Sequence, residues 1–341
     1  MKSKTMPEEL FFSKTRDYLD SYLNRQCGKS PHTVKAYRDV LTMFRRYILE
    51  EKGVSILKFK FSECTREFVL DFICHMKDKG YVPSSCNQRL SAIKAYLWFV
   101  ADGDITFQPL AMSVSRVPFL REPKLNRDII AEPELTALLS STPDSKMGLR
   151  DRTIMVLLYD SAIRLSEVLG LKLSDLNLIT ENPYIRIHGK GDKERIVAIT
   201  DKTVRHLQRY IQHYHPDSIN RNHPLFYTVI KEQMNTMSPG NVERIIKKYA
   251  DQVREEHPNL PDKVYPHMLR RTRATNLYQS GVELELVSRI LGHNSTQTTR
   301  IYATPSLEML RIAMESGNQP SIEEPLWSTD EDEMARICGL R

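Results

Sequence analysis

Residues 266–302 read PHMLRRTRATNLYQSGVELELVSRILGHNSTQTTRIY, and this stretch combines helical periodicity with several residues that could do chemistry. Its apolar residues recur at helical spacing over 268–280 and again over 283–291, which predicts two amphipathic helices. The polar residues of the stretch therefore occupy defined faces and ends of helices, where their spacing can be interpreted as chemistry.

Four of these polar residues could act on a phosphate group. His267 and Arg270 are three residues apart, which places them on one face of the first helix. His293 follows the second helix, and Tyr302 comes nine residues after His293. Arginine engages two phosphate oxygens at once and keeps its charge, histidine can donate hydrogen bonds or protons, and a tyrosine hydroxyl can serve as a nucleophile.

A second arginine lies upstream, in the sequence Ser161-Ala-Ile-Arg-Leu-Ser-Glu167. The pattern places Arg164 after one apolar helix and at the beginning of another. Glu167 comes three residues later, so its carboxylate can lie beside the arginine and hold the guanidinium in place.

A β-hairpin is predicted between these two regions. Residues 184–188 and 195–199 alternate in polarity, and the Gly- and Asp-bearing segment 189–193 between them is typical of a turn. Lys190 lies at the tip, where a mobile cation could reach a leaving oxygen.

Cleavage of a phosphodiester requires a nucleophile, neutralisation of charge on the phosphate oxygens and an acid for the leaving group. Metal ions or fixed cationic side chains can neutralise that charge. The sequence contains no HExxH helix, Walker loop or cysteine cluster, so it predicts neither a metal site nor a cofactor. Each cationic residue alone also has an ordinary structural explanation, such as a surface ion pair or a solvated turn.

Taken together, order and spacing resemble the tyrosine recombinase family, which includes the phage integrases and the Xer proteins. The resemblance is strongest over about residues 130–305 and includes the words AIRLSEVLGLKLSDL and HGKGDKERIVAIT. It implies a site-specific DNA recombinase or integrase that cleaves and rejoins DNA through a 3′-phosphotyrosine, without metal or ATP.

The resemblance also implies a role for each candidate residue. Arg164 and Arg270 would clamp the scissile phosphate, with Glu167 supporting Arg164. The sequence departs from the family pattern in two places, since Arg271 stands where histidine is frequent and Ala162 lies in a turn where glycine is frequent. Neither position belongs to the catalytic set.

The remaining roles concern protons and the nucleophile. Lys190 would protonate the leaving 5′-oxygen, and His267 and His293 would assist by hydrogen bonding and proton handling. Tyr302 would attack the phosphorus, and a second DNA end would later displace it, which divides one difficult step into two reversible ones.

The first hundred residues predict a small helical bundle. Ser30-Pro31 is typical of a helix start, and Thr65 is expected to begin another helix. Apolar residues at helical spacing predict helices after each of these and over 83–101. In size and position this part resembles the family's core-binding domain.

The fold class expected is mainly α with a small β-hairpin or sheet: an N-terminal helical bundle and an α+β catalytic domain. Loss of helical period and added prolines mark a linker. The expected layout is a helical DNA-clamp domain over 1–105, a linker over 106–128, a catalytic domain over 129–317 and an acidic tail over 318–341.

Charge is unevenly distributed along the chain. The last twenty residues hold six acids and two arginines, and removing this net −4 from the overall +6 leaves +10 on residues 1–321. A basic body suits a polyanionic partner such as double-stranded DNA. We expect two further helices after Tyr302, at 305–316 and after Ser328, and the resemblance implies that this tail docks on a neighbouring subunit in a homotetramer on DNA.

Five cysteines without CxxC pairing argue against a disulfide framework and favour a reducing, cytoplasmic location. The sequence has neither a secretion signal nor an apolar run long enough for a membrane helix.

Three other functions stay open: a DNA-binding regulator of the same fold without strand exchange, a type IB topoisomerase-like relaxation enzyme, and a metal-dependent nuclease. The sequence also leaves open the target site, accessory proteins, and whether the role is chromosome-dimer resolution, phage integration or movement of a transposon or other mobile element.

Overall fold

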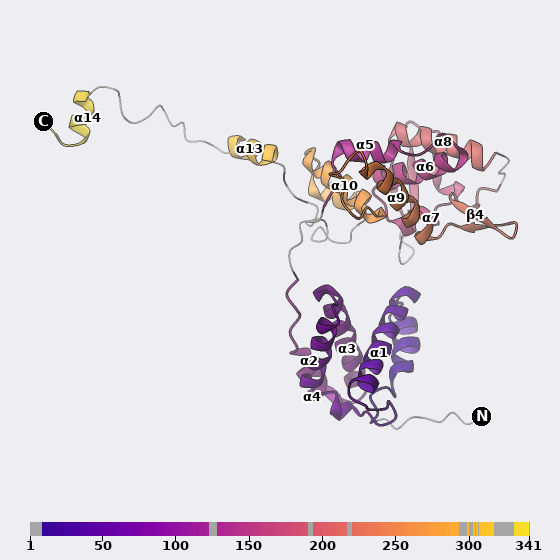
Figure 1. Cartoon of the computed structure of the whole chain (residues 1–341), viewed down its shortest axis with the longest axis vertical. Coiled ribbons are helices and arrows are strands. Elements are labelled where there is room, and N and C mark those ends of the chain that lie inside the picture. Colours follow the sequence, from indigo (N-terminus) through magenta and orange to yellow (C-terminus); the bar gives the residue numbers. More distant parts are fainter. Residues whose placement is uncertain are drawn as a thin grey trace. The chain divides into compact units, whose positions relative to one another are not determined.

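The computed structural model describes residues 9–122, 128–189, 194–216, 220–292, 299, 303, 305, 307–316 and 331–340 of the 341-residue chain. The chain divides into two compact units, Met1–Asn126 and Arg127–Arg341 (Figure 1). Each unit has its own hydrophobic core.

The regular elements of the first unit's described part are all helical. Its elements are the π-helix η1 (Asp17–Gln26), α1 (Pro31–Glu50), the 3₁₀ turn η2 (Phe61–Glu63), α2 (Arg66–Asp78), α3 (Pro83–Gly103), the 3₁₀ turn η3 (Ile105–Phe107) and α4 (Gln108–Ser115).

Helix starts in this unit follow the capping pattern. The Ser30 hydroxyl accepts a hydrogen bond from the Thr33 backbone N–H, and the Thr65 hydroxyl accepts one from Phe68. The core is rich in aromatic rings around the fully buried Phe11, whose ring centroid lies 5.0–5.6 Å from those of five others. Aromatic burial on this scale fixes how the helices pack.

The segment that the sequence assigns to a linker begins inside this unit. Helix α4 lies within 106–128, and Ala111 and Val114 bury its inner face in the core. The following residues run along α3, where the Asn87 side chain bonds both the N–H and the carbonyl of Leu120 and donates to Glu122 Oε1 at 2.9 Å. Pro109 suits the first turn of a helix as well as a linker, which explains the difference.

The second unit combines helices with two small sheets. Its helices are α5 (Glu132–Ser140), α6 (Lys146–Asp160), α7 (Leu165–Gly170), α8 (Asp201–Tyr214), α9 (Pro239–Arg254), α10 (Pro266–Gln279), α11 (Leu284–Leu291), α13 (Leu307–Ser316) and α14 (Glu331–Ile337). Helix α6 is buried along most of its length and packs against α5, α7, α8, α9 and α10.

One sheet contains three antiparallel strands, β1 (Leu176–Asn177), β2 (Tyr184–His188) and β3 (Glu194–Ala198), in the order β1-β2-β3. Strands β2 and β3 are the hairpin that the sequence predicts, with Ile185 opposite Val197 on the buried face. The second sheet, β4 (Tyr227–Ile230) with β5 (Gln233–Thr236), was not predicted.

The mainly helical fold class with small sheets is confirmed. Helix α13 lies where the sequence predicts the first helix after Tyr302, whereas the capping residue expected at 328 lies outside the described residues. No helix in the described ranges is long and apolar enough to cross a membrane.

Candidate active site

A tight turn between α6 and α7 places Arg164. Ala162 has φ +51°, a left-handed conformation that is uncommon for a residue with a Cβ. This residue is completely buried, and the chain then enters α7 with Arg164 as its N-cap. The unusual backbone of Ala162 therefore sets the direction in which Arg164 leaves the core.

Glu167 braces Arg164. One carboxylate oxygen accepts the Arg164 backbone N–H at 2.8 Å, and the other accepts Arg164 Nη1 at 3.0 Å. Burial raises the pKa of Glu167, but hydrogen bonds from Arg195 and from the Arg164 backbone, with the charges of both arginines, together hold this pKa below its ordinary value. The carboxylate is therefore ionised at neutral pH and fixes one edge of the exposed Arg164 guanidinium.

Arg270 approaches from α10 and is almost completely buried, with 1% of its surface exposed. Its Nη1 donates to the Ala162 carbonyl at 2.7 Å and its Nη2 to the Leu291 carbonyl at 2.7 Å. One guanidinium thus joins the turn before α7 to the end of α11. A cation held so rigidly is preorganised for an anion.

The neighbouring Arg271 has a structural task. Its Nη1 donates to the Tyr265 hydroxyl at 3.3 Å and its Nη2 donates to the Asp128 carbonyl. Next to it, the Thr272 hydroxyl accepts the Ile130 backbone N–H at 3.1 Å. The departure at position 271 therefore attaches α10 to the segment that enters the second unit.

Arg164, His267 and Arg270 line one pocket of about 310 Å³. Its lining also includes Ser166 in the first turn of α7, and Glu243 from α9. His267 is exposed in the first turn of α10, where backbone N–H groups and the helix dipole favour negative charge. The cationic side chains in its lining therefore make the pocket suitable for an anion such as a phosphate group.

Lys190, His293 and Tyr302 lie outside the described residues, so their predicted roles stay predictions. Their described neighbours are informative. Gly292, the residue before His293, ends α11 with φ +62° and its carbonyl accepts Arg164 Nη2 at 3.4 Å. The site residues that the structure brings together are thus Arg164, Glu167, His267 and Arg270.

The base of the β2–β3 hairpin is fastened by His188, two residues before Lys190. Its Nε2 lies 2.9 Å from Asp175 Oδ1 and its Nδ1 lies 3.0 Å from Glu194 Oε1. Asp175 is buried and also accepts the Lys172 backbone N–H at 2.8 Å. The histidine therefore ties both strands of the hairpin to the η4 turn (Leu173–Asp175).

Arg195 is a participant that the sequence did not predict. Its Nη1 and Nη2 bind the two carboxylate oxygens of Glu167 at 3.0 and 2.8 Å. The two residues are 28 positions apart, on β3 and α7, so no local spacing relates them. Only the position of Arg195 within the quoted HGKGDKERIVAIT segment could have drawn attention to it.

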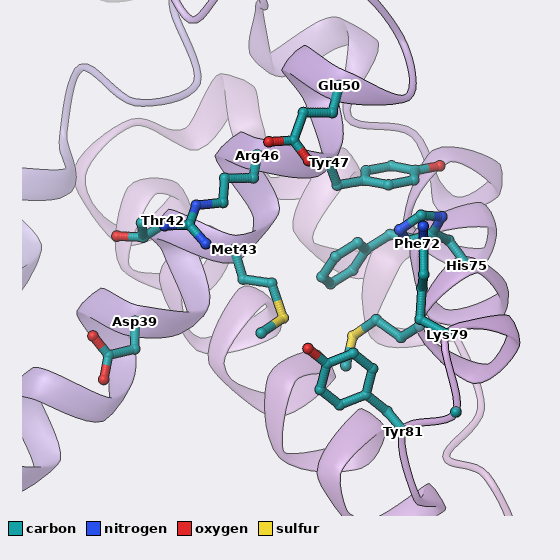
Figure 2. A pocket seen from close by; sticks show the side chains of 12 residues that line it. Asp39, Thr42, Met43, Arg46, Tyr47, Glu50, Phe72, His75, Lys79 and Tyr81 are labelled. Atoms are coloured by element: carbon teal, nitrogen blue, oxygen red, sulfur yellow. The ribbon is translucent and has the colours of Figure 1, made fainter.

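A larger pocket of about 660 Å³ lies in the first unit, between α1 and α2. Figure 2 shows the side chains of Met43, Phe72 and Tyr81 in this hollow. Asp39 and Glu50 also line it, and they match its lysine and arginine in number. This charge balance suits a phosphate group less well than the arginine pocket of the second unit. Within the described ranges, no group of three or more His, Cys, Asp or Glu side chains could hold a metal ion.

Comparison with known families gives two matches that together span most of the chain. Residues 129–308 match the Phage integrase family, and residues 17–102 match the Phage integrase, N-terminal SAM-like domain. Tyrosine recombinase XerA of Pyrococcus furiosus is 30% identical over 317 residues, covering 92% of this chain and 97% of the relative. Tyrosine recombinase XerC of Natranaerobius thermophilus is 28% identical, covering 84% of this chain and 92% of the relative.

Solved structures share the fold. The XerH site-specific recombinase bound to a palindromic difH substrate superposes with a TM-score of 0.67 at 18% identity, covering 94% of this chain and 98% of that chain. The Tn1549 transposon integrase in complex with a circular intermediate DNA gives a TM-score of 0.66 at 19% identity, covering 88% and 98%.

Proposed function

The chain belongs to the phage integrase family and is a tyrosine-type site-specific recombinase, a DNA strand-transferring enzyme, and we propose that Arg164, His267 and Arg270 hold the scissile phosphate in their common pocket. The observation that supports this proposal is the convergence of these three side chains, from two different helix starts, on one small pocket.

The two arginines divide the work. Arg270 is buried and held by two backbone carbonyls, so it supplies a fixed positive charge. Arg164 is more exposed and reaches the phosphate while Glu167 restrains it. As negative charge grows on the non-bridging oxygens, both guanidinium groups stabilise it without having to reorganise.

The reaction then proceeds in two balanced steps. The Tyr302 oxygen attacks the phosphorus, loses its proton to a neighbouring base, and the bond from phosphorus to the 5′-oxygen breaks. Lys190 protonates that oxygen, and His267 and His293 donate hydrogen bonds and handle protons. A 5′-hydroxyl of another DNA end later attacks the phosphotyrosine and releases Tyr302. The phosphate ester bond is exchanged and not hydrolysed, so its energy is kept and no ATP is needed. The cationic side chains take the place that a metal ion has in other phosphodiester-cleaving enzymes.

The DNA substrate is double-stranded, and the active assembly is a homo-oligomer, a tetramer made from two synapsed dimers. Two structures of similar fold, XerH bound to its difH substrate and a lambda integrase dimer bound to a COC′ core site, support DNA as the substrate and its binding by a dimer. The net charge of +10 on residues 1–321 favours phosphate contacts, so DNA affinity should fall steeply with salt.

A nicked suicide substrate tests the nucleophile. The duplex carries a site that the protein binds, with a nick placed so that the short cleaved fragment diffuses away and the adduct accumulates. In EDTA, we expect the wild-type chain to give a covalent protein–DNA band on a denaturing gel. Tyr302→Phe should lose at least 1,000-fold in this product, since removal of a nucleophile costs on the order of 10³ or more.

Tyr278→Phe, on α10, is a matched control that removes a hydroxyl from another tyrosine. A wild-type chain that binds the duplex without forming the adduct, or an adduct that persists in Tyr302→Phe, would contradict the proposed mechanism. Loss of the adduct in EDTA alone would instead indicate metal-dependent cleavage.

A further inference from the structure

The Glu167 carboxylate is shared by two arginines. Oε1 accepts Arg164 Nη1 and Arg195 Nη1, both at 3.0 Å, while Oε2 accepts the Arg164 backbone N–H and Arg195 Nη2, both at 2.8 Å. The Glu167 side chain is only 8% exposed. Since a buried carboxylate needs its hydrogen-bond donors, the orientation of Glu167 depends on Arg195 as much as on Arg164.

Arg195 belongs to the strand that follows the Lys190 turn. It lies opposite Ile187 in the β2–β3 register, with 20% of its side chain exposed. The fork of two N–H groups toward both carboxylate oxygens is the geometry that makes arginine selective for carboxylates. The hairpin is thereby connected to the beginning of α7.

The same guanidinium lies against Gly292. A Cβ atom at Gly292 would be 2.6 Å from both Cζ and Nε of Arg195, closer than any real Cβ contact. Gly292 also has φ +62° and its carbonyl accepts Arg164 Nη2 at 3.4 Å. Because Gly292 has no side chain, the Arg195 guanidinium can pack against its backbone. Gly292 is the residue directly before His293.

We propose that Arg195 is a positioning residue for DNA cleavage: it holds Glu167, and through it Arg164, in the orientation that faces the phosphate pocket, and it sets the backbone before His293. Arg195 does not line the pocket itself, so it acts through other residues. This role rests on the proposed function of Arg164. Without Arg195, Glu167 loses two donors and Arg164, 45% exposed, gains freedom to turn toward solvent.

The test compares Arg195→Ala and Arg195→Lys in the full chain. Single-turnover cleavage of the suicide substrate gives the rate constant, and a mobility shift gives the DNA dissociation constant. We expect Arg195→Ala to lower the cleavage rate constant on the order of 10- to 100-fold, as misplaced catalytic groups typically do, with DNA binding little changed. Arg195→Lys keeps the charge but lacks the pair of parallel N–H donors, so it should have a cleavage rate constant between those of Arg195→Ala and the wild type. Added guanidinium ion should partly restore the cleavage rate constant of Arg195→Ala.

Arg289→Ala is the matched control, because Arg289 also pairs with a glutamate, Glu285, at 2.9 Å, but on the exposed face of α11. It should cleave at the wild-type rate. A second readout is independent of cleavage: the pKa of the Glu167 carboxyl, followed by carbon NMR, should rise in Arg195→Ala and stay low in Arg289→Ala.

Gly292→Ala adds a coupling test, since its methyl group would displace the Arg195 guanidinium. Gly292→Ala should slow cleavage strongly in the otherwise wild-type chain. It should slow cleavage much less in Arg195→Ala, because that variant has no guanidinium to displace.

The two proposals fail in different ways. If the folded Arg195→Ala variant cleaves at the wild-type rate, the role of Arg195 is overturned and the proposed function is not. Equal loss in DNA binding and in cleavage would also overturn it, because Arg195 would then be a DNA contact or a purely structural residue. A wild-type chain without a Tyr302-dependent adduct would overturn the proposed function and this role with it.

Discussion

Ala162 shows how one backbone angle supports the site. Its left-handed φ of +51° costs a residue with a Cβ about 1–2 kcal/mol relative to glycine. The carbonyl of this residue nevertheless accepts Arg270 Nη1, so the turn and the buried arginine hold each other in place. The preference for glycine noted for this turn in the family thus has a structural reason, and alanine is the smallest departure from it.

We predict that Ala162→Gly changes the free energy of unfolding by less than about 1 kcal/mol, because relief of the strained φ offsets loss of a buried methyl group and a more flexible unfolded chain. Ala162→Val should destabilise the chain by more than about 2 kcal/mol, since a β-branched residue is strained at positive φ and overfills the buried site. Urea unfolding of both variants measures this. Equal stability of the two would contradict the argument.

Glu167 gives the site a pH dependence with a definite sign. Its pKa in the folded chain lies below the ordinary 4.5, so its ionised form stabilises the fold above that value and the stabilisation disappears as the pH falls through the lower folded pKa. Glu167→Gln should therefore destabilise the chain by about 3 kcal/mol at pH 7 and progressively less below pH 4.5. Unfolding titrations at several pH values test this, and a constant difference down to pH 3 would be inconsistent with it.

At the scale of elements, His188 links the hairpin to the rest of the second unit. We predict that His188→Ala weakens the β2–β3 pairing by about 1–3 kcal/mol, because buried Asp175 loses one of its donors. Amide hydrogen exchange in both strands should become faster. Arg186→Ala, an exposed residue on the same strand, is the control, and equal exchange in the two variants would contradict the prediction.

The long helices and the first hairpin could be predicted from sequence because their apolar periodicity and end residues agree. The β4–β5 hairpin could not. Its turn uses Lys231 and Glu232, both at positive φ, where the usual signal is Asn-Gly or Gly. Helix α4 was not predicted because Pro109 is compatible with a linker as well as with the first turn of a helix.

The site divides in the same way. Arg164, His267 and Arg270 were identifiable because each sits at or near a helix start with a recognisable neighbourhood, and the structure places them around one pocket. Arg195 was not identifiable, because its partner Glu167 comes near it only after β3 has paired with β2, the strand that packs beside α7. Contacts of this kind depend on tertiary structure and leave no local pattern.

Acidic residues outnumber basic ones in the C-terminal tail, where the last twenty residues hold six acids and two arginines. Helix α14 has seven residues, none of them buried, and Ile337 is 60% exposed, so the helix is too short to be stable by itself. We predict that truncation after Pro320 weakens cooperative binding to DNA with two adjacent sites, roughly 5- to 100-fold, a typical range for coupling between sites. Mobility shifts on one-site and two-site duplexes measure this. Unchanged cooperativity together with unchanged cleavage would exclude a coupling role.

The attachments on either side of the unit boundary have a further consequence. Asn87 on α3 donates a hydrogen bond to Glu122, and Arg271 on α10 donates one to the Asp128 carbonyl. Glu122 is thus attached to the first unit and Asp128 to the second, and only six residue steps of the chain separate them. A chain of that length spans at most about 20 Å. Under the proposal that both units contact DNA, binding by one unit would confine the other nearby at a local concentration on the order of millimolar. On that proposal, two surfaces of modest individual affinity would together bind the duplex tightly and could release it one surface at a time.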